Sequence, residues 1–231
     1  MSDENIKIAV VIPVYNEQEI IQTVITDVKK KLSKFDYMIL ILNDGSKDAT
    51  EEKLKIFNSD EKILIINKEN EGHGKTLIRG YDLALKEDYD YIFQIDSDDQ
   101  IPINELDKLI EFAKNYDLVC GHRHNRFDPL IRIITTIILR TVILLRHQIF
   151  IKDSNVPFRI MSKVFLKNNL EKVKNSDVPN ILLSIMASKS HSFKQVKTDH
   201  KERNTGIISI RRLKLFIFCI KTLLEVLKFK I

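Results

Sequence analysis

Short apolar runs alternate with amphipathic stretches along the first half of the chain. The runs are rich in Val, Ile and aromatic residues, which favour buried strands, and each leads through a polar loop into a stretch of helical periodicity. The predicted strands are 6–14, 37–42, 63–66 and 91–95, and the helices between them are 20–28, 49–58 and 77–85. This alternation predicts an α/β fold, with a mostly parallel sheet, right-handed crossovers and helices on both faces.

The second half continues the alternation less regularly. A helix is predicted at 104–115 and a strand at 118–121, followed by a long apolar segment at 129–151. The remaining predicted elements are an irregular or strand segment at 153–160, helices at 162–170 and 180–188, a strand at 193–198 and a helix at 213–227.

The fourth predicted strand ends abruptly in the acidic turn Asp96-Ser97-Asp98-Asp99. Crowded carboxylates repel one another and resist desolvation, so the turn needs open water or a cation. Asp96 and Asp98 are two residues apart, and in an extended segment both side chains point the same way. Oxygen ligands of this kind suit Mg²⁺ or Mn²⁺, often shared with substrate phosphates. The alternative is a solvated turn with helix-capping residues.

Polar loops also follow the other predicted strands. They contain Pro13-Val14-Tyr15-Asn16-Glu17, then Asp44, then Gly72-His73-Gly74-Lys75. In parallel sheets, ligands bind beyond the carboxyl ends of the strands, so these loops are expected along one edge with the acidic turn. The glycine loop either holds phosphate through backbone amides or only shapes the turn, and it lacks the Gly-Lys-Ser/Thr ending of a Walker loop.

The charge is divided unevenly along the 231 residues. Residues 1–120 contain 15 Lys and Arg against 25 Asp and Glu, whereas residues 121–231 contain 22 against 7. An acidic half suits a metal site, and a basic half suits phosphate groups or an anionic membrane surface. Nothing resembles a base-reading module, so nucleic acid is not an expected partner. Two cysteines and no visible secretory signal predict a reducing, cytoplasmic location.

Two segments of the second half predict amphipathic helices. On a helical wheel of 129–151, Arg132, Arg140, Arg146 and His147 fall within an arc of roughly 120° and leave a wide face of Ile, Leu and Val. These charges argue against a span, which needs about 20 apolar residues. The pattern fits a helix in a membrane interface, or one packed on the protein's own core or on a second subunit. The segment 213–227 has the same amphipathic pattern and leaves the same alternatives open.

The motifs in this order resemble those of the family 2 glycosyltransferases, which have the GT-A fold. The resemblance rests on four motifs: Ile12-Pro13-Val14-Tyr15-Asn16-Glu17, Asn43-Asp44-Gly45-Ser46, Asn70 to Lys75 with Gly80, and Asp96-Ser97-Asp98-Asp99-Gln100. Within the family the chain looks most like the polyprenyl-phosphate sugar synthases of the dolichyl-phosphate mannose synthase group. That narrower likeness rests on Gly121-His122-Arg123, Asp153 with Phe158-Arg159, His200 to Arg203, and Gly206 to Ser209.

The resemblance implies a role for each matching residue. Pro13, Tyr15, Glu17, Asp44, Lys75 and Asp96 would bind the nucleotide sugar; Asp96, Asp98 and Gln100 would bind the metal; and Arg123, Arg132, Arg159, Arg203 and Ser209 would face an acceptor phosphate. Asp96, Asp98 and Arg123 would be the catalytic residues. Two positions depart from the family pattern: Asn43 replaces an Asp and Pro157 replaces a Gly, which leaves base recognition and the acceptor open.

The implied activity is inverting, metal-dependent transfer of a sugar from a GDP- or UDP-linked donor to a polyprenyl phosphate, dolichyl or undecaprenyl. Residues 1–212 would form the GT-A domain, with 1–120 as its nucleotide-sugar and metal half and 121–212 as its acceptor half, followed by the helix of 213–231. The protein would lie peripherally on the cytoplasmic face of the membrane, and it could form a homo-oligomer. The alternatives are a hydroxyl acceptor, with Asp99, Asp128 or Asp153 as base, and an inactive membrane-bound scaffold.

Overall fold

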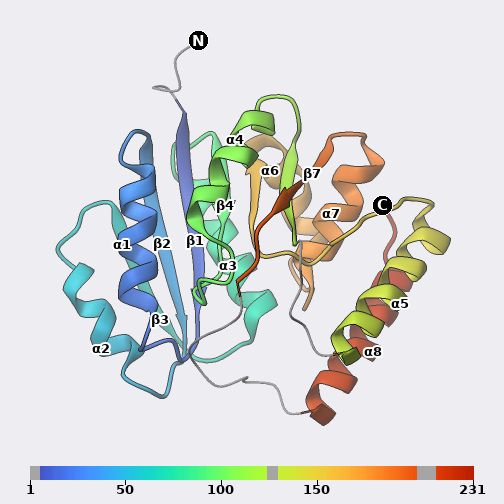
Figure 1. Ribbon diagram of the computed structural model, residues 1–231, viewed down its shortest axis with the longest axis horizontal. Helices are drawn as coiled ribbons and strands as arrows, with labels where there is room; N and C mark the ends of the chain where they lie inside the picture. The colour runs from blue at the N-terminus through green and yellow to red at the C-terminus, as the bar shows by residue number, and fades with distance from the viewer. Residues whose placement is uncertain (1–5, 124–129, 202–211) are drawn as a thin grey trace.

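One seven-stranded sheet organises the protein (Figure 1). The structure, a computed structural model, describes residues 6–123, 130–201 and 212–231; at 130–132 and 212–216 it describes the backbone alone. The strand order is β3-β2-β1-β4-β6-β5-β7. The strands are β1 (Lys7–Val14), β2 (Asp36–Asp44), β3 (Ile63–Lys68), β4 (Tyr91–Gln94), β5 (Leu118–Arg123), β6 (Arg159–Ser162) and β7 (Phe193–Thr198). β6 runs antiparallel to both neighbours, and the other pairs are parallel, as the alternating pattern predicted.

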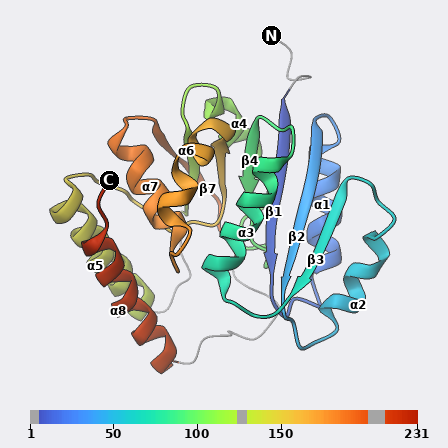
Figure 2. The ribbon, with the colours of Figure 1, turned by 180° about the vertical axis from the view of Figure 1, so that it is seen from behind.

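Helices cover both faces of this sheet. α1 and α4 lie on one face, and α3, α6 and α7 lie on the other (Figures 1 and 2). The helices are α1 (Ile21–Leu32), α2 (Thr50–Leu54), η2 (Lys55–Phe57), α3 (His73–Lys86), η3 (Ile103–Glu105), α4 (Leu106–Ala113), α5 (Leu130–His147), α6 (Lys163–Val173), α7 (Pro179–Lys189) and α8 (Arg212–Lys228).

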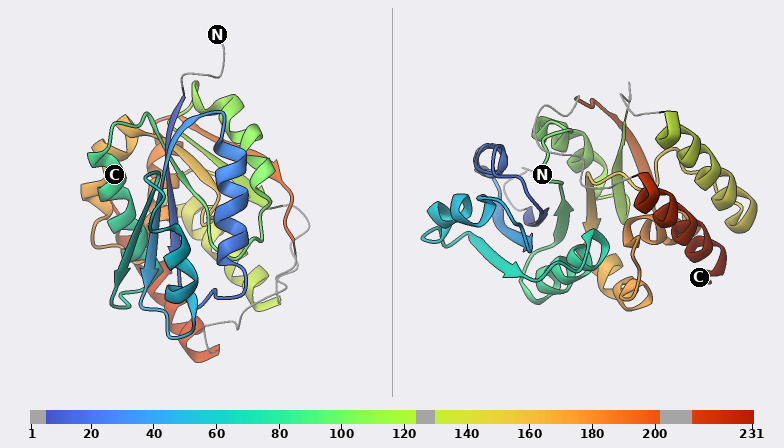
Figure 3. Two further views of the ribbon diagram at one scale, coloured as in Figure 1. Left: turned by 90° about the vertical axis from the view of Figure 1, so that its left-hand side faces the viewer. Right: turned by 90° about the horizontal axis from the view of Figure 1, so that it is seen from below.

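α5 and α8 form a pair that stands to one side of the sheet, as the view from below shows (Figure 3). Contacts join their carboxyl-terminal ends, where Arg146 donates a hydrogen bond to the Leu227 carbonyl at 3.0 Å. The two helices therefore run in the same direction. Among the described residues, no helix combines the length and the hydropathy needed to cross a bilayer.

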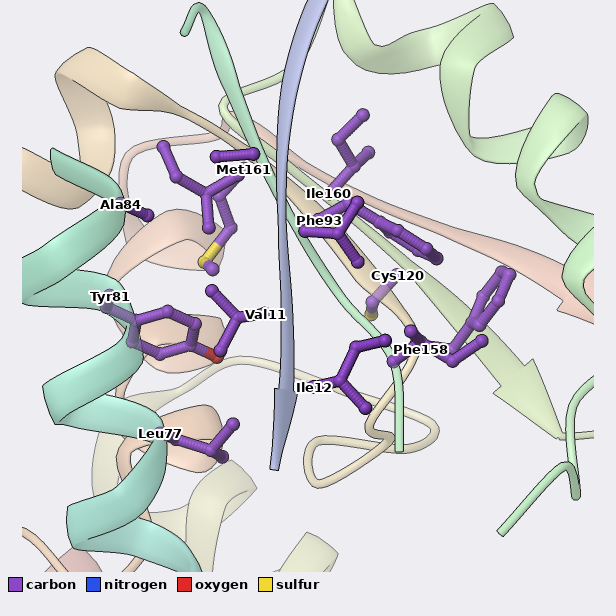
Figure 4. Close-up of a cluster of buried hydrophobic side chains, with 14 of the residues drawn as sticks. Val11, Ile12, Leu77, Tyr81, Ala84, Phe93, Cys120, Phe158, Ile160 and Met161 are labelled. Atoms are coloured by element: carbon purple, nitrogen blue, oxygen red, sulfur yellow. The ribbon is translucent and has the colours of Figure 1, made fainter. Parts of the chain in front are cut away.

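The core lies in two layers, one on each side of the central strands. On one side, Leu77, Tyr81 and Ala84 of α3 face Val11 of β1 (Figure 4). On the other side, the rings of Phe93 and Phe158 meet edge to face with centroids 5.1 Å apart. Strands covered on both faces carry apolar residues at successive positions, which explains the apolar runs of β1 and β2.

The sheet topology gathers several loops at one edge. β1 and β2 pair in parallel register, so Val14 lies opposite Asn43 and both strands end together. β4 ends at the same edge, and the antiparallel β6 begins there, with Arg159 opposite Gln94. Loops leaving β1, β2, β3 and β4 and the segment entering β6 consequently meet at the carboxyl edge, where α/β proteins bind ligands.

Two elements differ from the sequence prediction. The helix expected to begin at Leu77 begins at His73, so His73, Gly74 and Lys75 form its first turn rather than a loop. A Cβ on Gly74 would lie 2.3 Å from the Asp177 carbonyl oxygen, so this glycine permits the close approach of another backbone. The segment expected at 153–160 forms a strand only at Arg159–Ser162, one that runs against its neighbours.

Gly80 generates a prediction about the packing of α3 on the sheet. A Cβ at this position would lie 2.4 Å from Val11 Cγ1, so Gly80→Ala forces α3 away from β1. We expect a loss of about 1–3 kcal/mol in the free energy of unfolding, measured by urea denaturation, because overpacked cores are strained. Combining Gly80→Ala with Val11→Ala removes the clashing methyl group and restores part of the loss. Additive losses in the double variant would contradict this account.

Candidate active site

The acidic turn is fixed to β1 and bent sharply at one residue. Ser97 donates a hydrogen bond to the Pro13 carbonyl at 3.0 Å, which ties the turn to the end of β1. Asp99 has φ +51°, a left-handed conformation that is uncommon for residues other than glycine. The Gln100 amide donates to Asp98 Oδ1 at 3.3 Å. The backbone therefore holds Asp96, Asp98 and Gln100 on one short, cross-linked turn.

A small cavity opens directly beside this turn. Its volume is about 20 Å³, and its lining residues are Ile95, Asp96, Asp98, Gln100, Ile101, Arg123, Pro157, Phe158 and His200. The structure thus brings Arg123 of β5 to the turn that contains Asp96, Asp98 and Gln100, four residues for which site roles are predicted. His200 also lines the cavity; the narrower family likeness included this residue, but no role at the site had been predicted for it.

Asp96 is electrostatically the most perturbed carboxyl of the site. Burial raises its pKa well above the ordinary value, and the neighbouring charge of Asp98 raises it further, while Arg123 opposes the shift. His73 Nε2 lies 3.9 Å from Asp96 Oδ1, and no described residue donates a hydrogen bond to that buried oxygen. A carboxylate in this state favours the approach of a cation.

These donors fit a hard divalent cation. Asp96 and Asp98 offer carboxylate oxygens, Gln100 offers an amide oxygen on the same turn, and the buried Asp96 Oδ1 lacks a donor among the described residues. The described residues contain no group of three or more His, Cys, Asp or Glu side chains arranged to hold a metal by themselves. Mg²⁺ commonly takes one or two carboxylates together with substrate phosphates, so a pair of carboxylates suffices when a diphosphate is present.

Arg123 is held in place by a buried carboxylate. Its Nε donates to Asp153 Oδ2 at 2.7 Å and its Nη2 donates to Asp153 Oδ1 at 3.1 Å. Such a two-point contact fixes the plane of the guanidinium as well as its position. Arg123 is the last residue of β5, and Asp153 lies just before β6. The pair therefore ties the end of β5, at the cavity, to the segment that leads into β6.

Arg159 occupies a different environment from the one expected. Its side chain is fully buried, and it donates to the backbone carbonyls of Ser154, Val156 and Asn180 at 2.7–3.2 Å, and to Ser184 Oγ at 3.3 Å. This structure therefore directs the guanidinium of Arg159 at protein carbonyls rather than at a phosphate. Its charge still acts on the site, because it lowers the pKa of Asp96.

The loops after β1 and β2 hold each other through side-chain hydrogen bonds. The Asn16 amide donates to Ser46 Oγ at 2.9 Å, and the Lys47 amide donates back to Asn16 Oδ1 at 2.7 Å. The Glu17 amide donates to Thr50 Oγ1 at 2.8 Å. Tyr15, between these contacts and Pro13, is half-buried. The expected nucleotide-binding residues of β1 thus lie on a braced loop next to the acidic turn.

Asp44 fastens the glycine loop to the end of β2. Its carboxylate accepts hydrogen bonds from the Glu71 amide at 2.9 Å and the Gly72 amide at 3.0 Å, and it pairs with the buried ammonium group of Lys68. Burial alone would raise the pKa of Asp44, but Lys68, the Glu71 amide and the Thr76 hydroxyl outweigh it and lower the pKa below the ordinary value. A contact of Asp44 with a nucleotide stays a prediction.

The remaining expected residues are distributed as follows. Lys75 is exposed on the first turn of α3. Arg132 lies in α5, where its side chain is outside the described part of the structure. Arg203 and Ser209 lie outside the described residues altogether, so their expected contacts with an acceptor stay predictions. Lys201, the last described residue after β7, donates to Asp99 Oδ2 at 3.0 Å and so lies at the acidic turn.

Comparison with known families and sequences supports the interpretation of the motifs. The model of the family described as Glycosyl transferase family 2 matches residues 9–174. An uncharacterized protein of Methanocaldococcus jannaschii is 33% identical over 170 residues, covering 68% of this chain and 72% of that protein. An undecaprenyl-phosphate 4-deoxy-4-formamido-L-arabinose transferase of Pectobacterium carotovorum is 27% identical over 221 residues, covering 93% of this chain and 66% of that protein.

A second transferase with the same description, from Pectobacterium atrosepticum, is 33% identical over 138 residues, which is 57% of this chain and 41% of the relative. The chain thus spans less than two thirds of the length of both named transferases. Among solved structures, glucosyl-3-phosphoglycerate synthase from Mycobacterium tuberculosis in complex with Mn²⁺, uridine diphosphate and glucosyl-3-phosphoglycerate aligns with a TM-score of 0.70. It is 16% identical, with 97% of this chain and 81% of that chain covered, and the likeness is one of fold.

The buried Asp44–Lys68 pair yields a prediction of pH-dependent stability. Among the described residues, Asp44→Asn leaves Lys68 with only Glu71 Oε2, 3.1 Å away, as a carboxylate partner. We therefore expect a loss of about 3 kcal/mol at neutral pH, within the range for broken buried ion pairs. Because the folded-state pKa of Asp44 is lowered, its stabilisation is complete above the unfolded pKa of about 3.9 and disappears as the pH falls through the folded value.

Urea denaturation of wild type and Asp44→Asn across this pH range measures the effect, and the difference between them should shrink on acidification. Asp82→Asn is the matched control, because Asp82 forms an exposed pair with Lys86 on α3 and should change stability by less than about 1 kcal/mol. An equal gap between wild type and Asp44→Asn at all pH values would contradict the assignment.

Proposed function

Because this chain belongs to glycosyl transferase family 2, we propose that it transfers one sugar from a nucleoside-diphosphate donor to a polyprenyl phosphate. One observation supports the proposal above all others. Asp96 and Asp98, which suit a metal ion bound with a diphosphate, line the same cavity as Arg123, a cation that Asp153 holds in place. The descriptions of the undecaprenyl-phosphate transferases among the relatives agree with a lipid-phosphate acceptor.

The donor would bind along the ends of β1 and β4. Asp96, Asp98 and Gln100 would hold Mg²⁺ or Mn²⁺ together with the diphosphate, and the braced loop of Pro13, Tyr15 and Glu17 would hold the nucleoside, with Asp44 and Lys75 nearby. When bound, the cation neutralises the charge that grows on the leaving diphosphate. The donor class is a UDP- or GDP-linked sugar.

The acceptor phosphate would lie against Arg123, across the cavity from the donor turn. Asp153 fixes the guanidinium of Arg123 at the cavity, where its permanent positive charge would attract the phosphate and help to align it with the anomeric carbon. A phosphate monoester carries nearly two negative charges at neutral pH, since its second pKa is about 6. It attacks without a general base, and a single displacement inverts the anomeric centre.

A hydroxyl acceptor would instead require a general base, and the surroundings of the candidates do not favour one. Asp153 accepts two hydrogen bonds from Arg123, and Asp99 accepts one from Lys201. Asp128 lies outside the described residues. Both described candidates already accept hydrogen bonds from cationic side chains, so the described part of the site suits an acceptor that is already ionised.

The donor half of the proposal is tested with Asp98→Ala. This change removes one of the two carboxylates beside the cavity, so sugar transfer in the presence of Mn²⁺ should be abolished while the fold is kept. Uridine and guanosine diphosphates with Mn²⁺ should raise the melting temperature of the wild type but not of the variant, because only binding to the native state stabilises it. Asp82→Ala, on the exposed side of α3, is the control. Turnover retained by purified Asp98→Ala would refute the metal assignment.

The acceptor half is tested with Arg123→Ala. We expect KM for a detergent-solubilised polyprenyl phosphate to rise at least tenfold, the equivalent of one charge-assisted hydrogen bond of about 1.5 kcal/mol or more. Nucleotide binding with Mn²⁺ should stay near the wild-type value. Arg123→Ala also removes the cation that pairs with the buried carboxylate of Asp153. The double variant Arg123→Ala/Asp153→Asn therefore separates the loss of the acceptor contact from the effect of leaving Asp153 without this partner. Recovery of normal acceptor kinetics in the double variant would show that Arg123 does not contact the acceptor.

A further inference from the structure

The helix α5 turns its apolar face outward, whereas a surface helix of a water-soluble protein turns this face toward the core. Its outer face carries exposed aliphatic side chains: Ile133, Ile134, Ile137, Ile138, Leu144 and Leu145. Thr141 is the polar residue among them. Amphipathic helices normally turn their apolar stripe toward the core. Here the stripe that the sequence predicted points away from the protein.

The described arginines of α5 point toward the protein instead. Arg140 donates to the Lys152 carbonyl at 2.6 Å, and Arg146 donates to the Leu227 carbonyl at 3.0 Å. These contacts use the basic side chains to fasten the helix to the polypeptide behind it. The aliphatic face is consequently the side of α5 left for an external partner.

α8 extends the same apolar surface. It packs beside α5 through Ile143, His147, Thr222 and Val226, which are buried, and His147 Nε2 lies 3.0 Å from the Val226 carbonyl. Its outward positions Ile217, Ile220, Leu224 and Leu227 are exposed. We call the exposed aliphatic residues of both helices, with their common surface, the apolar helix face. Exposed apolar patches of this extent are rare on monomeric proteins and mark interaction sites.

The border of the apolar helix face is basic. Lys221 and Lys228 are exposed one step around α8 from Leu224, and Lys230 is exposed just beyond the helix. At the carboxyl-terminal ends of the pair, a pocket of about 250 Å³ is lined by Arg146, His147, Lys189, Phe229, Lys230 and Ile231. The sequence of α5 contains no Asp or Glu, and Glu225 is the single one in α8.

We propose that the apolar helix face docks on an anionic lipid surface. Aliphatic side chains would enter the boundary between head groups and acyl chains, and the lysines would meet the lipid phosphates. A second copy of this chain fits less well, because a two-fold interface places the same surface against itself and would bring lysines together without acidic partners. The positive charge of the border therefore favours an anionic lipid surface over a second copy of the chain.

The docking face is connected to the candidate active site through the chain itself. Arg140 of α5 holds the Lys152 carbonyl, and the next residue, Asp153, holds Arg123. The amino-terminal ends of α5 and α8 also lie toward the edge of the molecule where β1 and β2 end (Figures 1 and 2). Docking would hold the arginine side of the cavity near the head groups. The inference goes beyond the proposed function, since binding to lipid needs neither donor nor metal.

Flotation with phosphatidylcholine vesicles, with and without phosphatidylglycerol, tests the docking face. The wild type should float with the anionic vesicles, and the double variant Ile137→Ser/Leu145→Ser should bind them at least tenfold more weakly. The matched control is Ile56→Ser/Val164→Ser: Ile56 and Val164 are 64% and 69% exposed on other helices, against 53% and 77% for Ile137 and Leu145. The control should float like the wild type. Equal binding by both double variants, or none by the wild type, would overturn the proposal.

Two further measurements distinguish docking on anionic lipid from self-association of the protein. Lys221→Gln/Lys228→Gln should remove the preference for anionic vesicles, and an unchanged preference would contradict the role of the basic border. Light scattering without lipid should show that Ile137→Ser/Leu145→Ser leaves the oligomeric state unchanged. A wild-type dimer that this variant dissociates would assign the face to a second copy and overturn the proposal. Asp98→Ala should still bind vesicles, so loss of catalysis and loss of docking are distinguishable.

Discussion

Repulsion between two carboxylates at a partly buried strand end is the constraint on which the site depends. Asp96 and Asp98 share one short turn, and burial together with their mutual repulsion raises the pKa of Asp96. The protein offsets this repulsion with fixed positive charge on two sides. Arg123 approaches from β5, where Asp153 holds it, and Arg159 acts from the core behind the turn. Both arginines lower the pKa of Asp96, but burial and the charge of Asp98 outweigh them, so the pKa of Asp96 stays raised.

The loops around this turn are rigid because each is bonded to a neighbour. The β1 loop is bonded to the β2 loop through Asn16 and Ser46, and the β2 end is bonded to the glycine loop through Asp44. The first turn of α3 is packed against the backbone at Asp177, an approach that only Gly74 allows. Contacts between residues distant in sequence therefore fix the geometry of the cavity, and a local change in one loop is transmitted to the next.

The sequence predicted the alternation of strands and helices, the edge where loops gather, and the acidic turn, because periodicity and abrupt polar endings are local signals. It also predicted the arc of cations on α5. It did not predict that α3 begins at His73, since glycine usually interrupts a helix and the neighbour that requires it is Asp177, over a hundred residues away. The burial of Arg159 was equally hidden, because arginine is rarely buried and its carbonyl partners include Ser154, before β6, and Asn180 of α7.

The reversed direction of β6 has a consequence for how this fold can vary. β5 ends, and β6 begins, at the same edge of the sheet, so everything between Arg123 and Arg159 departs from that edge and returns to it. A segment that leaves and re-enters the sheet at one edge can be lengthened, shortened or replaced without altering the strand order, because the entropic cost of closing a loop rises only slowly with its length. The segment between β5 and β6 can therefore change while both strands keep their places in the sheet. Changes there could alter which acceptors the protein uses and leave the nucleotide-sugar half of the domain unchanged.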